Sequence, residues 1–378
     1  MSEPQSSPPP LPDAPRVQEG PNVRFRCPNC AAPLRWDPDV DALACEHCGS
    51  SMPVPRREGT IVEHPLEEAA SAPLGLDLAL RAVRCNECGA QVAFDADATA
   101  GECCFCGSPQ VLEQSANRRA LRPESLVPLD VGRASVEAGF RRWIGSRWFR
   151  PSALARTREF HAVGVYVPFW TYDATVDAQW SADAGYYYYV PVTYTTVVNG
   201  RPVLQTRMEQ RIRWEPAWGE RHDVYDDVLV HASRGLSPQL AAKLGSWDMR
   251  ALVPYRPEYL AGWRAEEYSV DLEQGWAQAL STIQAEEERR CSGDVPGDTQ
   301  RNLRVHNTVS AVRWKHVLLP MWSLTYRFQG RNFAVLIHGQ TGKVVGEAPL
   351  SWFKILGFVL LVLALLAAVI GVAALAGA

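Results

Sequence analysis

Eight of the ten cysteines in this 378-residue chain form four C-x-x-C pairs before residue 107, a pattern typical of metal ligands. The pairs make two quartets with the same spacing: Cys27, Cys30, Cys45 and Cys48, and then Cys85, Cys88, Cys103 and Cys106. Each C-x-x-C turn can aim two thiolates at one point, and a short hairpin brings the second pair opposite the first. The spacing therefore predicts two tetrahedral S₄ sites, each holding one structural Zn²⁺ ion.

The two quartets belong to an internal repeat. Every cysteine of the second quartet lies 58 positions after its counterpart, and Trp36 and Phe94 occupy equivalent positions, as do Asp37 and Asp95. A segment of this size is too small to fold around a core of its own, so we expect metal binding and folding to be coupled.

Other chemistry is open to cysteines in this pattern. A single C-P-x-C can be a thiol–disulfide motif, but two quartets with identical spacing favour zinc. Iron in the same S₄ geometry is a third possibility. Cys104 is predicted not to be a ligand, although it could substitute for a neighbouring cysteine. His47, which lies between Cys45 and Cys48, is predicted to be solvated.

The charge of the repeat bears on what it binds. Between Pro21 and Ser115 there are seven arginines, no lysine and fourteen acidic residues. Each Zn(Cys)₄ centre would add further negative charge of about −2. Nucleic-acid binding requires positive charge facing phosphates, so the balance favours protein contact over nucleic acid.

The C-terminal segment has the composition of a membrane-spanning helix. From Ile355 to Ala378 no residue is charged or strongly polar, and a helix of this length, roughly 36 Å, can cross a hydrocarbon core of about 30 Å. Trp352 and Lys354 precede it, as expected at a membrane interface. We therefore predict a single-pass tail anchor, with the bulk of the chain in the cytoplasm; the family resemblance described below implies that the membrane is a bacterial inner membrane.

The remaining sequence divides into segments of different composition. The boundaries predicted are a disordered leader at 1–20, zinc ribbon 1 at 21–57, a linker at 58–80, zinc ribbon 2 at 81–115, an α+β domain with its own core at 116–350, and the anchor at 352–378. Overall hydropathy is low, with a mean of −0.17, which excludes a polytopic membrane protein.

The domain at 116–350 is predicted to be rich in antiparallel sheet. Strands are predicted at 163–176, 186–198, 202–214 and 228–232, with a hairpin turn at Asn199-Gly200, and a closing meander at 313–328, 333–338 and 344–345. Helices are predicted at 236–245 and 270–290.

An arginine-rich segment, 118–160, also shows the periodicity of an amphipathic helix. The apolar positions are Val136, Phe140, Trp143, Ile144 and Trp148. The stripe fits either a helix docked on the sheet or a helix lying on a membrane surface.

The sequence shows none of the catalytic motifs that we can recognise. It has no phosphate-binding G-x-x-x-x-G-K-[ST], H-E-x-x-H or G-x-S-x-G motif. The most suggestive polar cluster, His222-Asp223 with Asp226-Asp227, is interpreted as a solvated turn. We therefore predict that the chain is not an enzyme.

Several motifs resemble those of a known family. They are Tyr166-Val-Pro-Phe-Trp-Thr-Tyr-Asp173, Tyr259-Leu-Ala-Gly262, Leu319-Pro-Met-Trp322, and Gly339-Gln-Thr-Gly-Lys-Val-Val-Gly346. Together with the double cysteine quartet they resemble bacterial membrane-anchored double zinc-ribbon proteins. Members are labelled TFIIB-type zinc ribbon proteins, or primosomal protein N′ (replication factor Y), superfamily II helicase-like. The resemblance also implies SPFH-domain or phage-shock-type envelope proteins as partners.

Three functional hypotheses follow. The first is a non-enzymatic membrane-anchored adaptor that recruits cytosolic protein partners in envelope stress or membrane organisation, with oligomerisation possible. The second is a nucleic-acid-binding replication or helicase accessory protein. The third is an enzyme whose site the motifs do not reveal. Salt-dependent DNA binding would distinguish the second hypothesis from the first.

Overall fold

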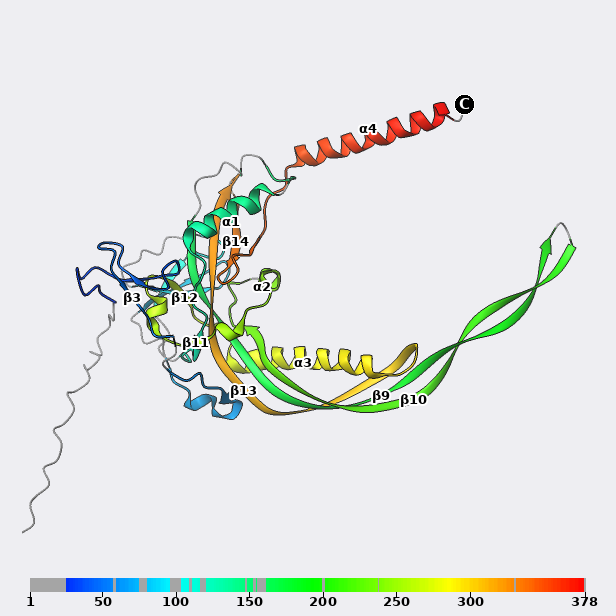
Figure 1. Ribbon diagram of the computed structural model, residues 1–378, viewed down its shortest axis with the longest axis horizontal. Helices are drawn as coiled ribbons and strands as arrows, with labels where there is room; N and C mark the ends of the chain where they lie inside the picture. The colour runs from blue at the N-terminus through cyan, green and yellow to red at the C-terminus, as the bar shows by residue number, and fades with distance from the viewer. Residues whose placement is uncertain are drawn as a thin grey trace, which may run out of the picture.

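The computed structural model confirms an α+β chain dominated by antiparallel sheet (Figure 1). The structure describes residues 25–56, 59–74, 80–95, 103–108, 111–115, 120–146, 148–151, 154, 161–198, 201–236, 238–329 and 331–376. The predicted leader and the predicted turn Asn199-Gly200 lie outside the described residues.

Three very long strands form the backbone of the molecule. They are β9 (His161–Val198), β10 (Arg201–His231) and β13 (Thr299–Phe328). β9 lies in the middle, pairing antiparallel with β10 on one edge and with β13 on the other. Segments that the sequence predicted as separate strands, 163–176 and 186–198, are thus parts of one strand. Figure 1 shows the three strands curving away from the body of the molecule.

The curvature is accompanied by irregularities in both ladders near the body. The register between β9 and β10 shifts between Tyr225 and Val228, and that between β9 and β13 shifts between Ser310 and Arg313. At both places a non-glycine residue has positive φ, 53° at Asp227 and 51° at Ala311. Bulges of this kind bend a strand and increase its twist, which is how the sheet departs from a flat arrangement.

Helix α3 (Leu272–Asp294) covers the long strands. Asp271 caps its start by accepting a hydrogen bond from the Gln274 amide at 2.8 Å. Its buried residues recur at helical spacing: Leu272, Gly275, Ala279, Ile283, Glu287 and Cys291. Gly275 permits close packing, because a Cβ there would lie 2.5 Å from the hydroxyl oxygen of Tyr172.

Short elements complete the body around the long strands. They are β4 (His64–Pro65), a 3₁₀ helix (Leu66–Ser71), β8 (Ser125–Leu126), α2 (Pro238–Leu244), a 3₁₀ helix (Met249–Ala251), β11 (Val253–Pro254), a 3₁₀ helix (Pro257–Leu260), β12 (Arg264–Glu266), β14 (Arg331–His338) and β15 (Val344–Gly346). β13, β14 and β15 form the predicted closing meander.

The two cysteine segments are built differently. The first forms a separate three-stranded sheet of β1 (Arg35–Asp37), β2 (Ala42–Ala44) and β3 (Ser51–Met52). The second forms β5 (Leu80–Cys85), β6 (Gln91–Asp95) and β7 (Val111–Ser115), which join the main sheet through pairing of β6 with β12. Because β12 also pairs with β9, ribbon 2 is continuous with the long strands.

Both ribbons contribute to the hydrophobic core of the α+β part. Trp36 of ribbon 1, 1% exposed, shares one cluster with Tyr166 and Trp322 of the long strands. Val83 and Phe105 of ribbon 2 share a second cluster with strand residues of β9 and β13. The structure thus differs from the expectation that the α+β domain has a core of its own, because the ribbons complete that core.

Helix α1 (Arg133–Gly145) carries the apolar stripe that was expected to face either the sheet or a membrane surface. Val136, Phe140 and Ile144 are buried in the same cluster as Trp36, so the stripe packs against the body. Trp148 lies beyond the helix and is 76% exposed.

The C-terminal helix α4 (Trp352–Ala376) projects away from the body (Figure 1). Its segment Trp352–Gly371 has a mean hydropathy of 2.8 and no residue buried within the protein. Among the described residues, one helix is therefore long and apolar enough to cross a membrane, as the sequence predicted.

Candidate metal centres and the adjoining pocket

The eight predicted cysteine ligands lie in two groups of four, with all the sulfur atoms of each group within 4.8 Å of one another. In the first group the Sγ–Sγ distances are 3.5 Å for Cys27–Cys48 and 3.5 Å for Cys30–Cys45. In the second, Cys85–Cys106 and Cys88–Cys103 are each separated by 3.6 Å. Four sulfurs at about 2.3 Å from one tetrahedral ion lie about 3.8 Å apart, so each group could bind one metal ion.

The four C-x-x-C turns share one backbone conformation, which explains why the local sequence places the thiols. In each turn the first cysteine donates its amide to the carbonyl five residues on, as in Cys27 to Ala32 at 2.8 Å. Its carbonyl accepts from the amide four residues on, as with Gly49 to Cys45 at 2.9 Å. That fourth residue has positive φ in every turn: Ala31, Gly49, Gly89 and Gly107.

The environment favours ionisation of one thiol in each group. A hydrogen bond with the Ser50 side chain, 3.2 Å from Cys48 Sγ, lowers the pKa of Cys48 to about 6. The side chain of Cys88 lowers the pKa of Cys103 to about 5. Although a backbone hydrogen bond opposes them, desolvation and the neighbouring thiols raise the pKa of Cys30 to about 12, and contact with Cys103 raises the pKa of Cys88. The shifts therefore favour thiolate, the metal-binding form, at one position of each group, and a bound metal ion would select it at all four.

Two residues near the ligands remain outside the centres. Burial raises the pKa of Cys104 to about 12, so this side chain stays a thiol, and it is not among the clustered sulfurs. The Ser323 hydroxyl donates a hydrogen bond to the backbone carbonyl of Cys104. His47 is exposed and also absent from the cluster. Both placements agree with the sequence analysis.

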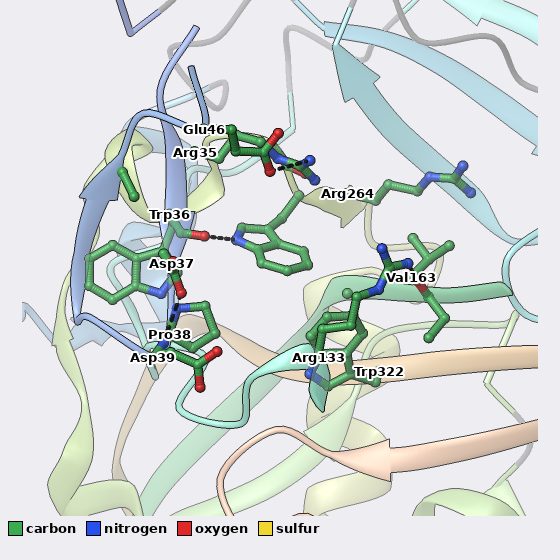
Figure 2. A pocket seen from close by; sticks show the side chains of 15 residues that line it. Arg35, Trp36, Asp37, Pro38, Asp39, Glu46, Arg133, Val163, Arg264 and Trp322 are labelled. Carbon is green, nitrogen blue, oxygen red and sulfur yellow. Dashed lines mark hydrogen bonds and ion pairs between the residues drawn. The ribbon is translucent and has the colours of Figure 1, made fainter. Parts of the chain in front are cut away.

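A pocket of about 490 Å³ lies where ribbon 1 meets the sheet and α1 (Figure 2). Ribbon 1 contributes Arg35, Pro38 and Glu46, while Arg133 of α1 and Arg264 of β12 reach it from the body. Sequence analysis did not find this pocket, because its walls come from segments more than two hundred residues apart.

Two tryptophans form the apolar part of the pocket. Trp263 packs edge-on to Trp322, with ring centroids 5.1 Å apart. The Trp263 indole donates to the Trp36 carbonyl at 2.9 Å, which ties β12 to ribbon 1 (Figure 2). Its ring lies over Gly164, where a Cβ would come within 2.3 Å of it. The glycine therefore leaves the space that the indole occupies.

Arginine side chains line the rim of this pocket. Arg35 is held by Glu46 at 3.2 Å and donates to the Gly262 carbonyl at 3.1 Å. Arg133 donates to the Ala162 carbonyl at 3.1 Å. These bonds fix the guanidinium groups beside the indoles. The pocket thus offers apolar ring faces together with planar hydrogen-bond donors.

A third group of potential ligands, Asp173, Asp226 and Asp227, lies at the bulges of the long strands. Lys315 pairs with one member of the group, because its ammonium lies 2.7 Å from Asp227, and it also lies 2.8 Å from Glu63. Burial and the neighbouring Glu63 raise the pKa of Asp173 to about 6. This group is therefore an ion-pair network at the bend of the strands.

The polar cluster His222-Asp223 with Asp226-Asp227 does not converge on one site. His222 bonds Asp177 at 2.7 Å and is exposed, while Asp223 is held by Arg221 and Arg290. These residues lie on β10 rather than in the predicted turn. The prediction of a turn at this position is therefore wrong, because the strand continues through it with a bulge.

Comparison with known proteins gives a relative but no function. The uncharacterised protein YdjG of Bacillus subtilis (strain 168) is 27% identical over 335 residues, covering 88% of this chain and 92% of that protein. No protein-family model matches the chain, and no solved structure matches it.

Proposed function

We propose that this chain is a non-enzymatic membrane-anchored adaptor whose two zinc ribbons help to recruit cytosolic protein partners. The observation that carries the proposal is the pocket between ribbon 1 and the body, lined by Trp263, Trp322 and arginines. Its volume, about 490 Å³, suits one or two side chains of a bound peptide segment. Tryptophan and arginine are the residues that most often dominate protein recognition.

The metal centres support the same proposal through their structural character. Each group offers four thiols, which would complete tetrahedral zinc and leave no position for a substrate. Zinc would thereby fix ribbon 1, which forms one wall of the pocket. The ions would be structural Zn²⁺, and their loss would remove the wall.

The pocket composition supports binding rather than catalysis. Its described lining contains carboxylates and guanidiniums but neither histidine, serine, cysteine nor lysine side chains. Of its carboxylates, Glu46 pairs with Arg35, and Asp37 accepts a hydrogen bond from the Asp39 amide, so these groups stabilise the pocket wall. We infer that the pocket holds an apolar side chain against the indoles, with an acidic neighbour on the side of Arg133 and Arg264, because Arg35 already pairs with Glu46.

The cellular setting follows from α4 and from the family resemblance. We propose that α4 anchors the chain in a bacterial inner membrane with the ribbons in the cytoplasm, where thiols stay reduced. The partners that the resemblance implies are SPFH-domain or phage-shock-type envelope proteins. The acidic charge of the ribbon segment favours protein over nucleic acid as the ligand.

Photo-crosslinking from the pocket rim tests this function. Benzoylphenylalanine replaces Glu46, whose side chain is 75% exposed, in the full chain within native membranes. Arg35 loses its ion pair with Glu46 but keeps its hydrogen bond to the Gly262 carbonyl. The expected product is a protein adduct that Arg133→Glu abolishes. A carboxylate is tolerated there, since position 133 is in the first turn of α1, where the helix dipole favours it.

Arg141→Glu is the matched control, because Arg141 is an exposed α1 residue outside the pocket lining. It should leave the adduct unchanged. Equal adducts in both variants would overturn the pocket as the recruitment site, and crosslinking to nucleic acid would favour the replication-accessory hypothesis.

A further inference from the structure

The far end of the β9–β10 hairpin forms a two-stranded arm without a third strand. We define the arm as Tyr186–Val198 of β9 and Arg201–Arg213 of β10. The pairing of β13 with β9 begins at Thr299 opposite Gly185, so among the described residues the arm has no other strand beside it. At about 3.4 Å per residue the arm extends about 44 Å from the end of β13.

The pairing register sorts the arm's side chains by charge. Residues directly opposite each other share one face of a sheet. All five charged residues lie on the same face, since they pair with even-numbered positions of β9: Arg201, Arg207, Glu209, Arg211 and Arg213. The opposite face carries no charged side chain in its six pairs: Tyr187–Ile212, Tyr189–Gln210, Pro191–Met208, Thr193–Thr206, Thr195–Leu204 and Val197–Pro202.

The apolar side chains of the uncharged face are exposed, most strongly towards the tip. Leu204 is 74% exposed and Val197 is 69% exposed, followed by Met208 at 61%. On the charged face, Val203 near the tip is also exposed. The three pairs next to the end, Val197–Pro202, Thr196–Val203 and Thr195–Leu204, therefore present aliphatic and threonine side chains on both faces, and the final pair, Val198–Arg201, adds one exposed arginine.

Behind the tip lies a belt of tyrosines and arginines. The guanidinium of Arg207 lies 5.5 Å from the ring centroid of Tyr194, and that of Arg213 lies 5.6 Å from the ring of Tyr186. Aliphatic residues near the end, with tyrosine and arginine behind them, follow the order of polarity across a membrane interface. Arg201 in the final pair can extend its guanidinium to lipid phosphates while its stem stays among the aliphatic residues. Four arginines against one glutamate give the arm a net charge of +3, which complements anionic lipid.

We propose that the tip of this arm inserts shallowly into the anionic surface of the membrane that holds α4. Figure 1 shows the arm curving at its far end towards the side of the molecule on which α4 lies. The four residue rows from Arg201 to Leu204 span about 10 Å, which matches the depth of the headgroup and acyl boundary. The unpaired backbone edges keep the insertion shallow, because they cannot be satisfied in hydrocarbon.

The two membrane contacts would have different tasks. α4 would retain the chain in the bilayer, whereas the arm would bind the adjacent surface only where it carries anionic lipid. Neither contact uses the pocket. Membrane contact by the arm therefore does not depend on partner recruitment through ribbon 1.

The test uses the full chain inserted through α4 into vesicles of phosphatidylcholine, with and without phosphatidylglycerol as one quarter of the lipid. Benzoylphenylalanine replaces Leu204 at the tip, or Trp218, which is 77% exposed on the same strand nearer the body. Mass spectrometry of the isolated peptides detects lipid adducts. The Leu204 position should form them, more strongly with phosphatidylglycerol, and the Trp218 position should not.

Charge variants separate electrostatic attraction from chance contact. Arg207→Gln with Arg211→Gln should reduce the lipid adduct by about fivefold for each charge lost, whereas Arg250→Gln, on an exposed side chain far from the arm in sequence, should not. Unchanged circular dichroism, together with unchanged metal content, shows that each variant keeps its sheet and its ribbons. Equal adducts at both probe positions, no dependence on phosphatidylglycerol, or crosslinking of Leu204 to a second copy of the chain would each overturn the proposal.

Discussion

At the residue scale, the cysteine turns depend on one backbone position with positive φ. Three of the four turns use glycine there, and ribbon 1 uses Ala31 with φ of 62°. An alanine in this region is strained because its Cβ approaches the backbone, which costs about 1 kcal/mol. Sequence could identify the ligands, but it gave no reason to single out Ala31 until the four turns were compared in three dimensions.

Ala31→Gly is therefore expected to stabilise ribbon 1 by roughly 0.5–1 kcal/mol. The reverse change at the equivalent position of ribbon 2, Gly89→Ala, should destabilise by a similar amount. A Cβ at Gly89 meets no atom within 4 Å, so only backbone strain acts there. Both changes in stability are measured as the fraction of bound metal that each variant retains in competition with a metal chelator. Lower metal retention in Ala31→Gly would contradict the strain argument.

Buried histidine gives the chain a pH dependence of its own. Burial lowers the pKa of His316 to about 4, and its Nδ1 lies 2.9 Å from the Leu121 carbonyl. In the unfolded chain its pKa is about 6.5, so the unfolded state binds more protons between these values. The stability contributed by neutral His316 is thus present above pH 6.5 and lost as pH falls towards 4.

Replacing His316 with Gln should remove this dependence. The free energy of unfolding of the wild type should fall more steeply than that of the variant between pH 6.5 and 5, by up to about 1.4 kcal/mol per pH unit. Protonation of the cysteine ligands affects both proteins equally, so the difference isolates His316. Parallel pH profiles in denaturant titrations would show that the histidine is accessible to protons in the folded state.

At the scale of elements, periodicity predicted the amphipathic helix and the closing meander because both are encoded in neighbouring residues. The length of β9 was not predictable, because Gly185 and the alternating polar residues of its middle resemble a break between strands. Contacts such as Lys315 with Glu63 join residues 252 positions apart and carry no local signal. The pocket and the packing of the ribbons into the common core were not predicted for the same reason, because both depend on contacts between residues far apart in the sequence.

That packing predicts coupling between metal binding and the sheet. Replacing Cys27 and Cys30 with Ser should reduce the metal content from two ions to one and release Trp36, at a cost of about 3–5 kcal/mol. Because Trp36 shares a cluster with Tyr166, amide hydrogen exchange in the nearby part of β9 should accelerate. Exchange restricted to ribbon 1 would mean that the ribbon folds independently of the sheet.

At the scale of the whole molecule, a long arm and one apolar helix extend from a body that carries the cysteine ribbons at its other side (Figure 1). Deleting residues 353–378 should move the chain from the membrane fraction to the soluble fraction, because the exposed apolar helix is removed. Cell fractionation of the truncated chain measures this. If the truncated chain stayed fully membrane-bound, even in high salt, α4 would not be the anchor.

Metal stoichiometry tests the central claim most directly, since bound zinc would hold ribbon 1, and with it the pocket wall and part of the common core, in place. Native mass spectrometry of the full chain, released from detergent under reducing conditions, counts and identifies the bound ions. Two zinc ions per chain are predicted. One ion, none, or iron in their place would contradict the account of a double zinc-ribbon adaptor.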